Sequence, residues 1–212
     1  MIDAPLTLCV DAFWISPYAL SAFVALEEKG LPYTTVELNL ATKDHQKPGY
    51  AARTGRVPSL QHGDYVLSES SAIAEYLAET FPFPKYPRLF PENLQQRGIA
   101  REIMAWVRSD LMPIREERST TSMFYERAAR PLSAAGEKAK QRLIDAVTPL
   151  IRGTTLFDAW CLADTDLAVM LQRLNLNGDS LPPALKTYAE ANWQRPSVQK
   201  WVSRVRKPYQ TY

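Results

Sequence analysis

The chain has 212 residues, with a hydrophobic fraction of 46% and a charged fraction of 23%, which excludes a disordered, collagen-like or coiled-coil protein. This length suits one compact domain or two small ones. The formal net charge of +2 argues against a strong nucleic-acid binder, but residues 1–80 carry 5 Lys+Arg against 10 Asp+Glu and the remainder is basic. This asymmetry indicates two modules.

The two cysteines define no cross-linked or metal-bound framework. Cys9 lies in an apolar run and Cys161 follows Trp160, with no CxxC pair, so we expect neither a disulfide scaffold nor a metal site. No segment approaches the ~20 apolar residues of a membrane span, and no basic segment precedes an apolar stretch at the N-terminus. We expect a cytoplasmic protein whose partners include neither membrane nor nucleic acid.

Strand and helix signals alternate in the first module. The apolar run 6–10 suits a buried strand, 17–29 has helical spacing ended by Gly30, and 33–40 alternates as a strand. The intervening helix supplies the crossover that would make these two strands parallel.

The rest of the first module reads as a weak helix, a hairpin and a second helix. Short strands at 56–61 and 65–67 flank a Gly-containing turn, and hydroxyls with a carboxylate at 68–71 precede an apolar helical run. The fold class predicted for residues 1–80 is therefore α/β.

Four prolines within 81–91 favour a stiff linker. Everything beyond it reads helical, so residues 92–212 are predicted to form an all-α module. Its helices are predicted at 93–118, kinked near Pro113, and then at 134–152, 163–174, 184–191 and 197–206.

Three local features could carry chemistry, and each has a purely structural alternative. Val57–Pro58 in a strand context suits an edge, a bend or a cis peptide, which leaves the main chain of Val57 free to pair with a peptide-like ligand. Glu69 and Ser70 at a helix start could hold an ammonium and a carboxylate, or be a cap and a solvated acid. Ser16 before Pro17 could stabilise a thiolate, or be a simple N-cap.

Taken together, these motifs resemble the cytosolic glutathione transferase superfamily over essentially the whole chain. The resemblance rests on Ser16-Pro17-Tyr18 with the helix that follows, on Val57–Pro58, and on the helix start within 67–77. It implies a thioredoxin-like N-terminal domain, a Pro-rich linker and a helical-bundle C-terminal domain.

The resemblance also implies site residues and partners. Ser16 would face the sulfur of glutathione, the co-substrate, and the main chain of Val57 beside Pro58 would pair with its cysteinyl unit. The γ-glutamyl end would lie at Glu69 and Ser70. His45 and Arg56 fall where some classes of the superfamily place groups that reach the glycine carboxylate of glutathione.

The second substrate, a small electrophile or a peroxide, would lie between the modules. The candidates for its site, chosen by analogy and by position, are Trp14, Trp106, Met112 and Arg115. Ordinary helix core is the alternative for Trp106 and Met112. A homodimer is expected because family members commonly form two-fold dimers.

The family's helix-capping box appears here as Cys161 and Asp164, with a thiol in place of a hydroxyl, and we interpret it as structural. The resemblance implies a glutathione-dependent enzyme of detoxification type, which conjugates electrophiles or reduces organic hydroperoxides. A noncatalytic binding or assembly module of the same fold is the alternative. A disulfide reductase is the weakest option, because Ser16 stands where such an enzyme would use cysteine.

Overall fold

The computed structural model describes residues 4–211, which divide into two compact units. The first unit runs through Leu89 and resumes at Lys200, and the second is Phe90–Gln199. None of the helices within the described residues combines the length and the apolar character that a membrane span requires.

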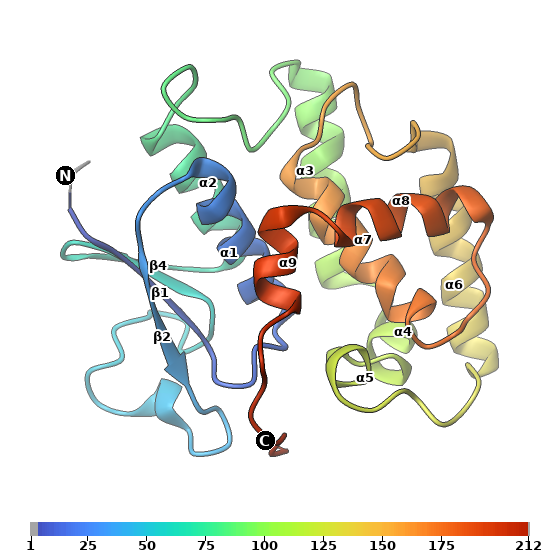
Figure 1. The fold of residues 1–212 in the computed structure, drawn as a ribbon, viewed down its shortest axis with the longest axis horizontal. Coiled ribbons are helices and arrows are strands. Elements are labelled where there is room, and N and C mark those ends of the chain that lie inside the picture. The colour runs from blue at the N-terminus through green and yellow to red at the C-terminus, as the bar shows by residue number, and fades with distance from the viewer. Residues whose placement is uncertain (1–3, 212) are drawn as a thin grey trace. The chain divides into compact units, whose positions relative to one another are not determined.

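A four-stranded sheet with two long helices forms the first unit (Figure 1). The strand order is β2-β1-β3-β4, with β1 and β2 parallel and the other pairs antiparallel. This is the predicted thioredoxin-like arrangement. The bounds are β1 (Leu6–Asp11), α1 (Pro17–Lys29), β2 (Thr34–Leu38), β3 (Ser59–His62), β4 (Tyr65–Ser68) and α2 (Ser70–Thr80).

Local signals at both ends explain where α1 begins and ends. The N-cap residue is Ser16, Pro17 stands at the first helical position, and Gly30 closes the helix with a φ of 64°. Proline tolerates the first turn because no amide donor is needed there, and glycine adopts the left-handed cap without steric cost. Most of α1 is buried, since the helix packs on both β1 and α2.

The weak helix predicted between β2 and β3 is reduced to one 3₁₀ turn, η1 (Asp44–Gln46). Pro48 and Gly49 follow it after Lys47 and oppose helix propagation. The segment therefore crosses from β2 to β3 mostly as irregular chain.

The second unit is helical, as predicted, and centres on α7, in which every residue from Leu162 to Leu174 is buried. This helix contacts α3, α4, α5 and α8. Its elements are α3 (Leu94–Ser109), α4 (Met112–Glu117), α5 (Thr120–Phe124), α6 (Ala134–Val147), η2 (Thr148–Leu150), α7 (Leu162–Asn175) and α8 (Pro183–Trp193). The last helix, α9 (Pro196–Val202), begins in the second unit and ends in the first.

The single helix predicted over 93–118 is divided in two. The break lies at Leu111, whose φ of 59° is left-handed, and α4 starts immediately after it. Pro113 lies in the first turn of α4, where its missing amide hydrogen costs nothing. The proline therefore marks a helix start and not a kink.

The C-terminal segment departs from the predicted domain division. The last helix ends at Val202 instead of 206, and residues from Lys200 onward group with the first unit. The side chain of Trp201 is fully buried there, with its ring centroid 4.6 Å from that of Trp14 and 5.4 Å from that of Phe23. Burial of this aromatic cluster explains why the segment packs with the sheet-bearing unit.

Candidate active site

The register of the sheet brings three of the predicted segments to one end of the first unit. The first residue of β3 pairs with Cys9 of β1 and with the last residue of β4. Val57–Pro58 directly precedes β3, Glu69 directly follows β4, and β1 continues past Cys9 toward the loop that ends at Ser16. These chain segments therefore emerge side by side.

Ser16 caps α1 and remains half-buried. Its Oγ accepts a hydrogen bond from the amide of Ala19 at 3.2 Å. A serine hydroxyl that accepts through a lone pair still has its own hydrogen to donate. The geometry thus presents an O–H donor at a helix N-terminus, where the helix dipole favours an anion.

Asp11 holds the loop that carries Ser16, and sequence reasoning missed it. Its buried carboxylate accepts the amide of Phe13 at 3.2 Å and of Ile15 at 3.0 Å through Oδ1, and the amide of Ser16 at 2.9 Å through Oδ2. Burial raises the pKa of the Asp11 carboxyl, while these amide hydrogen bonds act to lower it. The available signal was an acid placed directly after the apolar run 6–10.

The peptide bond between Val57 and Pro58 is cis. Pro58 is buried and Val57 is half-buried, outside the β3 ladder. A second unpredicted residue, Tyr50, supports this turn: its hydroxyl donates to the carbonyl of Arg56 at 2.6 Å and lies 3.0 Å from Oγ of Ser59. Tyr50 therefore contacts the main chain before Val57–Pro58 and a side chain after it.

Glu69 is the N-cap residue of α2 and has a left-handed φ of 71°. A non-glycine residue in this region is strained, and such residues cluster at ligand sites. Its side chain is exposed, whereas Ser70 is only 3% exposed. The preceding Ser68 Oγ is buried and has no hydrogen-bond partner within residues 4–211.

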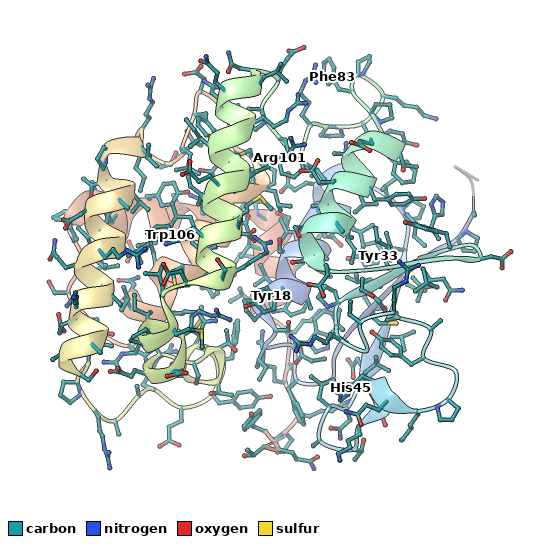
Figure 2. The ribbon with its side chains drawn as sticks, turned by 180° about the vertical axis from the view of Figure 1, so that it is seen from behind. Tyr18, Tyr33, His45, Phe83, Arg101 and Trp106 are labelled. Atoms are coloured by element: carbon teal, nitrogen blue, oxygen red, sulfur yellow. The ribbon has the colours of Figure 1, made fainter. Side chains whose placement is uncertain are left out.

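The other two predicted glutathione contacts lie on the irregular segment between β2 and β3. His45 is in the 3₁₀ turn η1 (Figure 2), with Nε2 3.2 Å from Nε2 of Gln46. Its Nδ1 is buried and lacks a hydrogen-bond partner among the described residues. The side chain of Arg56 is exposed. Both stay predictions for the glycine carboxylate.

The structure places Trp14 in the core of the first unit, contrary to its predicted place in the electrophile site. Its side chain is 3% exposed, and its indole Nε1 donates to Oε1 of Glu37 at 2.8 Å. The left-handed φ of 54° at Trp14 accompanies a ring packed against Phe23 and Trp201. Proximity to Ser16 in sequence was a poor guide, because the backbone turns between the two residues.

The remaining three predicted electrophile-site residues belong to the second unit. Trp106 is half-buried on α3 (Figure 2), donates from Nε1 to Asp110 at 3.0 Å, and lines a hollow of about 480 Å³ with residues of α6. Met112 is 44% exposed, and its sulfur lies 3.2 Å from Nη1 of Arg115. Met112 and Arg115 thus form a contacting pair, whereas Trp106 faces the hollow between α3 and α6.

The described residues contain no group of three or more His, Cys, Asp or Glu side chains that could hold a metal ion. What the site offers instead is a hydroxyl, main-chain groups at Val57 that lie outside the sheet ladder, a carboxylate and a helix N-terminus. This set suits a small zwitterionic peptide with a thiol.

Comparison with known proteins identifies the family. Residues 15–80 match the glutathione S-transferase N-terminal domain, and 93–207 match the C-terminal domain. A glutathione transferase homolog from Burkholderia gl BGR1, solved with bound glutathione, is 39% identical, with a TM-score of 0.77 over 95% of this chain and 97% of that one.

Two curated relatives extend the comparison. Glutathione S-transferase 3 of Zea mays is 28% identical over 92% of both chains. Maleylpyruvate isomerase of Ralstonia sp is 34% identical over 108 residues, and that match spans about half of each protein (50% of this chain and 50% of the isomerase). Together with the two domain matches and the fold, these likenesses show that the chain belongs to the cytosolic glutathione S-transferase superfamily.

Proposed function

We propose that this protein is a glutathione transferase that binds glutathione on its first unit and uses Ser16 to stabilise the thiolate. Three kinds of observation support the proposal: the family, the glutathione bound to the Burkholderia homolog, and the meeting of the Ser16 loop, Val57 and Glu69 at one end of the sheet. Thiolate attack on an electrophilic carbon is the chemistry that the co-substrate supplies.

The observation that carries the proposal is the state of the Ser16 hydroxyl. Because Oγ accepts from the amide of Ala19, its O–H bond is polarised and its hydrogen is available to a neighbouring anion. A free thiol has a pKa near 8.5, so an enzyme that uses it at neutral pH must lower that pKa. A shift of about two units corresponds to roughly 2.7 kcal/mol of preference for the anion. The hydroxyl, the amides and the helix dipole would share this stabilisation.

The tripeptide would be held by its main chain and its charged ends. Val57 offers main-chain groups outside any ladder, and Glu69 offers an exposed carboxylate for the ammonium group. Ser70 begins α2 and supplies the helix N-terminus for the α-carboxylate. We assign His45 and Arg56 to the glycine carboxylate, since both offer N–H donors and Arg56 brings a positive charge to this otherwise acidic module.

The second substrate is a small electrophile or an organic hydroperoxide. We assign it to Met112 and Arg115, whose contacting side chains combine an apolar and a cationic surface, with Trp106 as a further candidate. The proposed setting is a cytoplasmic homodimer with a detoxification role. Sedimentation of the purified protein tests the dimer.

The decisive experiment compares two N-cap serines. Ser133 caps α6 by accepting from the amide of Gly136 at 3.1 Å, much as Ser16 caps α1. Either Ser→Ala change should cost about 1 kcal/mol of stability as a lost cap. Only Ser16→Ala should also lower kcat/KM for glutathione and an aryl halide, by about 10²-fold, because a donor to the developing anion is removed.

Wild type and both variants should be compared for glutathione affinity, aryl-halide turnover and reduction of cumene hydroperoxide. Isomerisation of a cis-unsaturated dioxo acid should be measured as well, because an isomerase is among the relatives. Tight retention on glutathione without turnover of any substrate would favour the noncatalytic module. Equal activity of Ser16→Ala and Ser133→Ala would remove Ser16 from the mechanism.

A further inference from the structure

The segment after α9, residues 203–211, lies against the loop that carries Ser16; we call it the C-terminal strap. It belongs to the same unit as the sheet, and Figure 1 shows it leaving α9 toward the loop between β1 and α1. Arg206 donates to the carbonyl oxygen of Trp14 from Nη2 at 3.1 Å and from Nε at 3.3 Å. The strap therefore contacts the loop two residues before Ser16.

The same guanidinium also closes the end of α9. Arg206 donates to the carbonyls of Trp201 at 3.0 Å and Val202 at 2.9 Å. A guanidinium presents its donors in a rigid, planar fork, so carbonyls bound to several of them are held in a fixed relation. The loop is thereby tied to the buried end of α9, where Trp201 is anchored in the aromatic cluster.

One peptide unit of the loop is held at both ends. The carbonyl of Trp14 accepts from Arg206, and the amide of the same peptide, at Ile15, donates to Oδ1 of Asp11 at 3.0 Å. The next amide, at Ser16, donates to Oδ2 of Asp11 at 2.9 Å. Because a peptide unit is planar, fixing both of its ends fixes its rotation, and this rotation sets the direction in which Ser16 begins α1.

The backbone at Trp14 needs such support. A left-handed φ is unfavourable for a bulky residue such as Trp14 and persists only where its surroundings hold it. The ring is covered by Arg204, whose guanidinium carbon lies 3.7 Å from its centroid. One residue earlier, the ring of Phe13 meets that of Tyr209, with centroids 5.4 Å apart. The strap thus contacts both residues 13 and 14.

We propose that Arg206 is a positioning residue: it orients the Trp14–Ile15 peptide and so sets the Ser16 hydroxyl against the thiolate. This inference rests on the proposed function, since it concerns the same hydroxyl. It gives Arg206, which lies beyond α9, a part in the reaction that acts through the Ser16 loop.

The test measures the pKa of the thiol of bound glutathione, from thiolate absorbance against pH, together with kcat and KM. Wild type is compared with Arg206→Ala, Arg206→Lys and Ser16→Ala. A misdirected donor should raise the thiol pKa and lower kcat about tenfold in Arg206→Ala, with a smaller change in KM for glutathione. Arg206→Lys keeps the charge without the fork and should lie between Arg206→Ala and wild type.

Arg195→Ala is the matched control, because its guanidinium stacks 3.9 Å from the centroid of Trp160, in the second unit. It should keep the wild-type thiol pKa. A wild-type pKa and kcat in Arg206→Ala, with both altered in Ser16→Ala, would overturn the inference and leave the proposed function standing. Wild-type values in Ser16→Ala would overturn both. If circular dichroism shows Arg206→Ala unfolded, a wild-type thiol pKa in Arg206→Lys would overturn the inference.

Discussion

Two buried aspartates, one in each unit, accept hydrogen bonds from backbone amides in the same way, but the segments that they hold carry very different residues. Asp11 accepts three loop amides. Asp164 accepts the amides of Leu156 at 2.7 Å and Cys161 at 2.8 Å, and the hydroxyl of Tyr188 at 2.9 Å. Both side chains are fully buried, and burial raises the pKa of each carboxyl. The anchors alone do not distinguish a functional site from a structural one.

The difference lies in the residue that each anchored segment presents. Ser16 is only half-buried, as the proposed contact between its hydroxyl and a ligand requires. Cys161 is 1% exposed, and burial raises the pKa of its thiol well above the ordinary value. The capping box at α7 is therefore structural, as its sequence indicates, whereas the loop before α1 combines a rigid backbone with an accessible group.

The largest effect is expected from Asp164→Ala. It leaves two buried amides and a buried tyrosine hydroxyl without their acceptor, which should cost about 3 to 5 kcal/mol of unfolding free energy. Asp158→Ala, an exposed acid on the preceding loop, should change stability by less than about 0.5 kcal/mol. Urea denaturation measures both, and equal midpoints for the two variants would contradict the anchoring role of Asp164.

An intermediate effect, mainly on activity, is expected from Asp11→Asn. In the variant, the amide nitrogen of the asparagine would replace one carboxylate oxygen and face a backbone N–H group. Two donors cannot form a hydrogen bond with each other, so the Ser16 loop would be disturbed. We expect kcat/KM to fall about 10²-fold, with a loss of stability of about 1 to 3 kcal/mol.

Asp164→Asn is the matched variant for this comparison. It should lose a similar amount of stability but keep the wild-type pKa of the bound thiol, measured by thiolate absorbance. A normal thiol pKa in Asp11→Asn would show that the two anchors are functionally equivalent after all.

The smallest effect is expected at Lys29, a buried basic residue, in contrast to the two buried aspartates. Lys29 is 2% exposed and donates to the carbonyl of Phe81 at 2.6 Å; burial and the charge of Arg88 lower its pKa from 10.5 to about 8. Between these values the unfolded chain binds more protons than the folded one, so this contribution to stability grows as pH rises and is lost as pH falls through about 8.

Lys29→Met should flatten this rise, because it keeps the apolar stem and removes the proton-binding group. Denaturation midpoints across alkaline pH measure the change, and the exposed Lys138→Met should retain the wild-type profile. A wild-type slope in Lys29→Met would contradict the assignment and show that burial and the charge of Arg88 do not depress the pKa of Lys29.

Short-range patterns in the sequence determined much of the framework. The sequence predicted the alternation of strand and helix, because periodicity is a property of neighbouring residues. It also predicted the cap at Ser16 before Pro17 and the start of α2 next to Glu69, because each depends on residues within one turn of each other. The parallel pairing of β1 and β2 followed from the helix between them.

Only the tertiary structure decided which residues support the site. Asp11 could be recognised as an anchor only once its burial and its three amides were known. Trp14 lies two residues from Ser16 but turns into the core, and Arg206 reaches the same loop from the far end of the chain. The physical reason is the distance along the chain over which each feature is determined. Helix caps and hydrophobic periodicity depend on neighbouring residues, whereas the burial of a side chain and the hydrogen-bond partner of a charged group depend on distant segments that only the fold brings together.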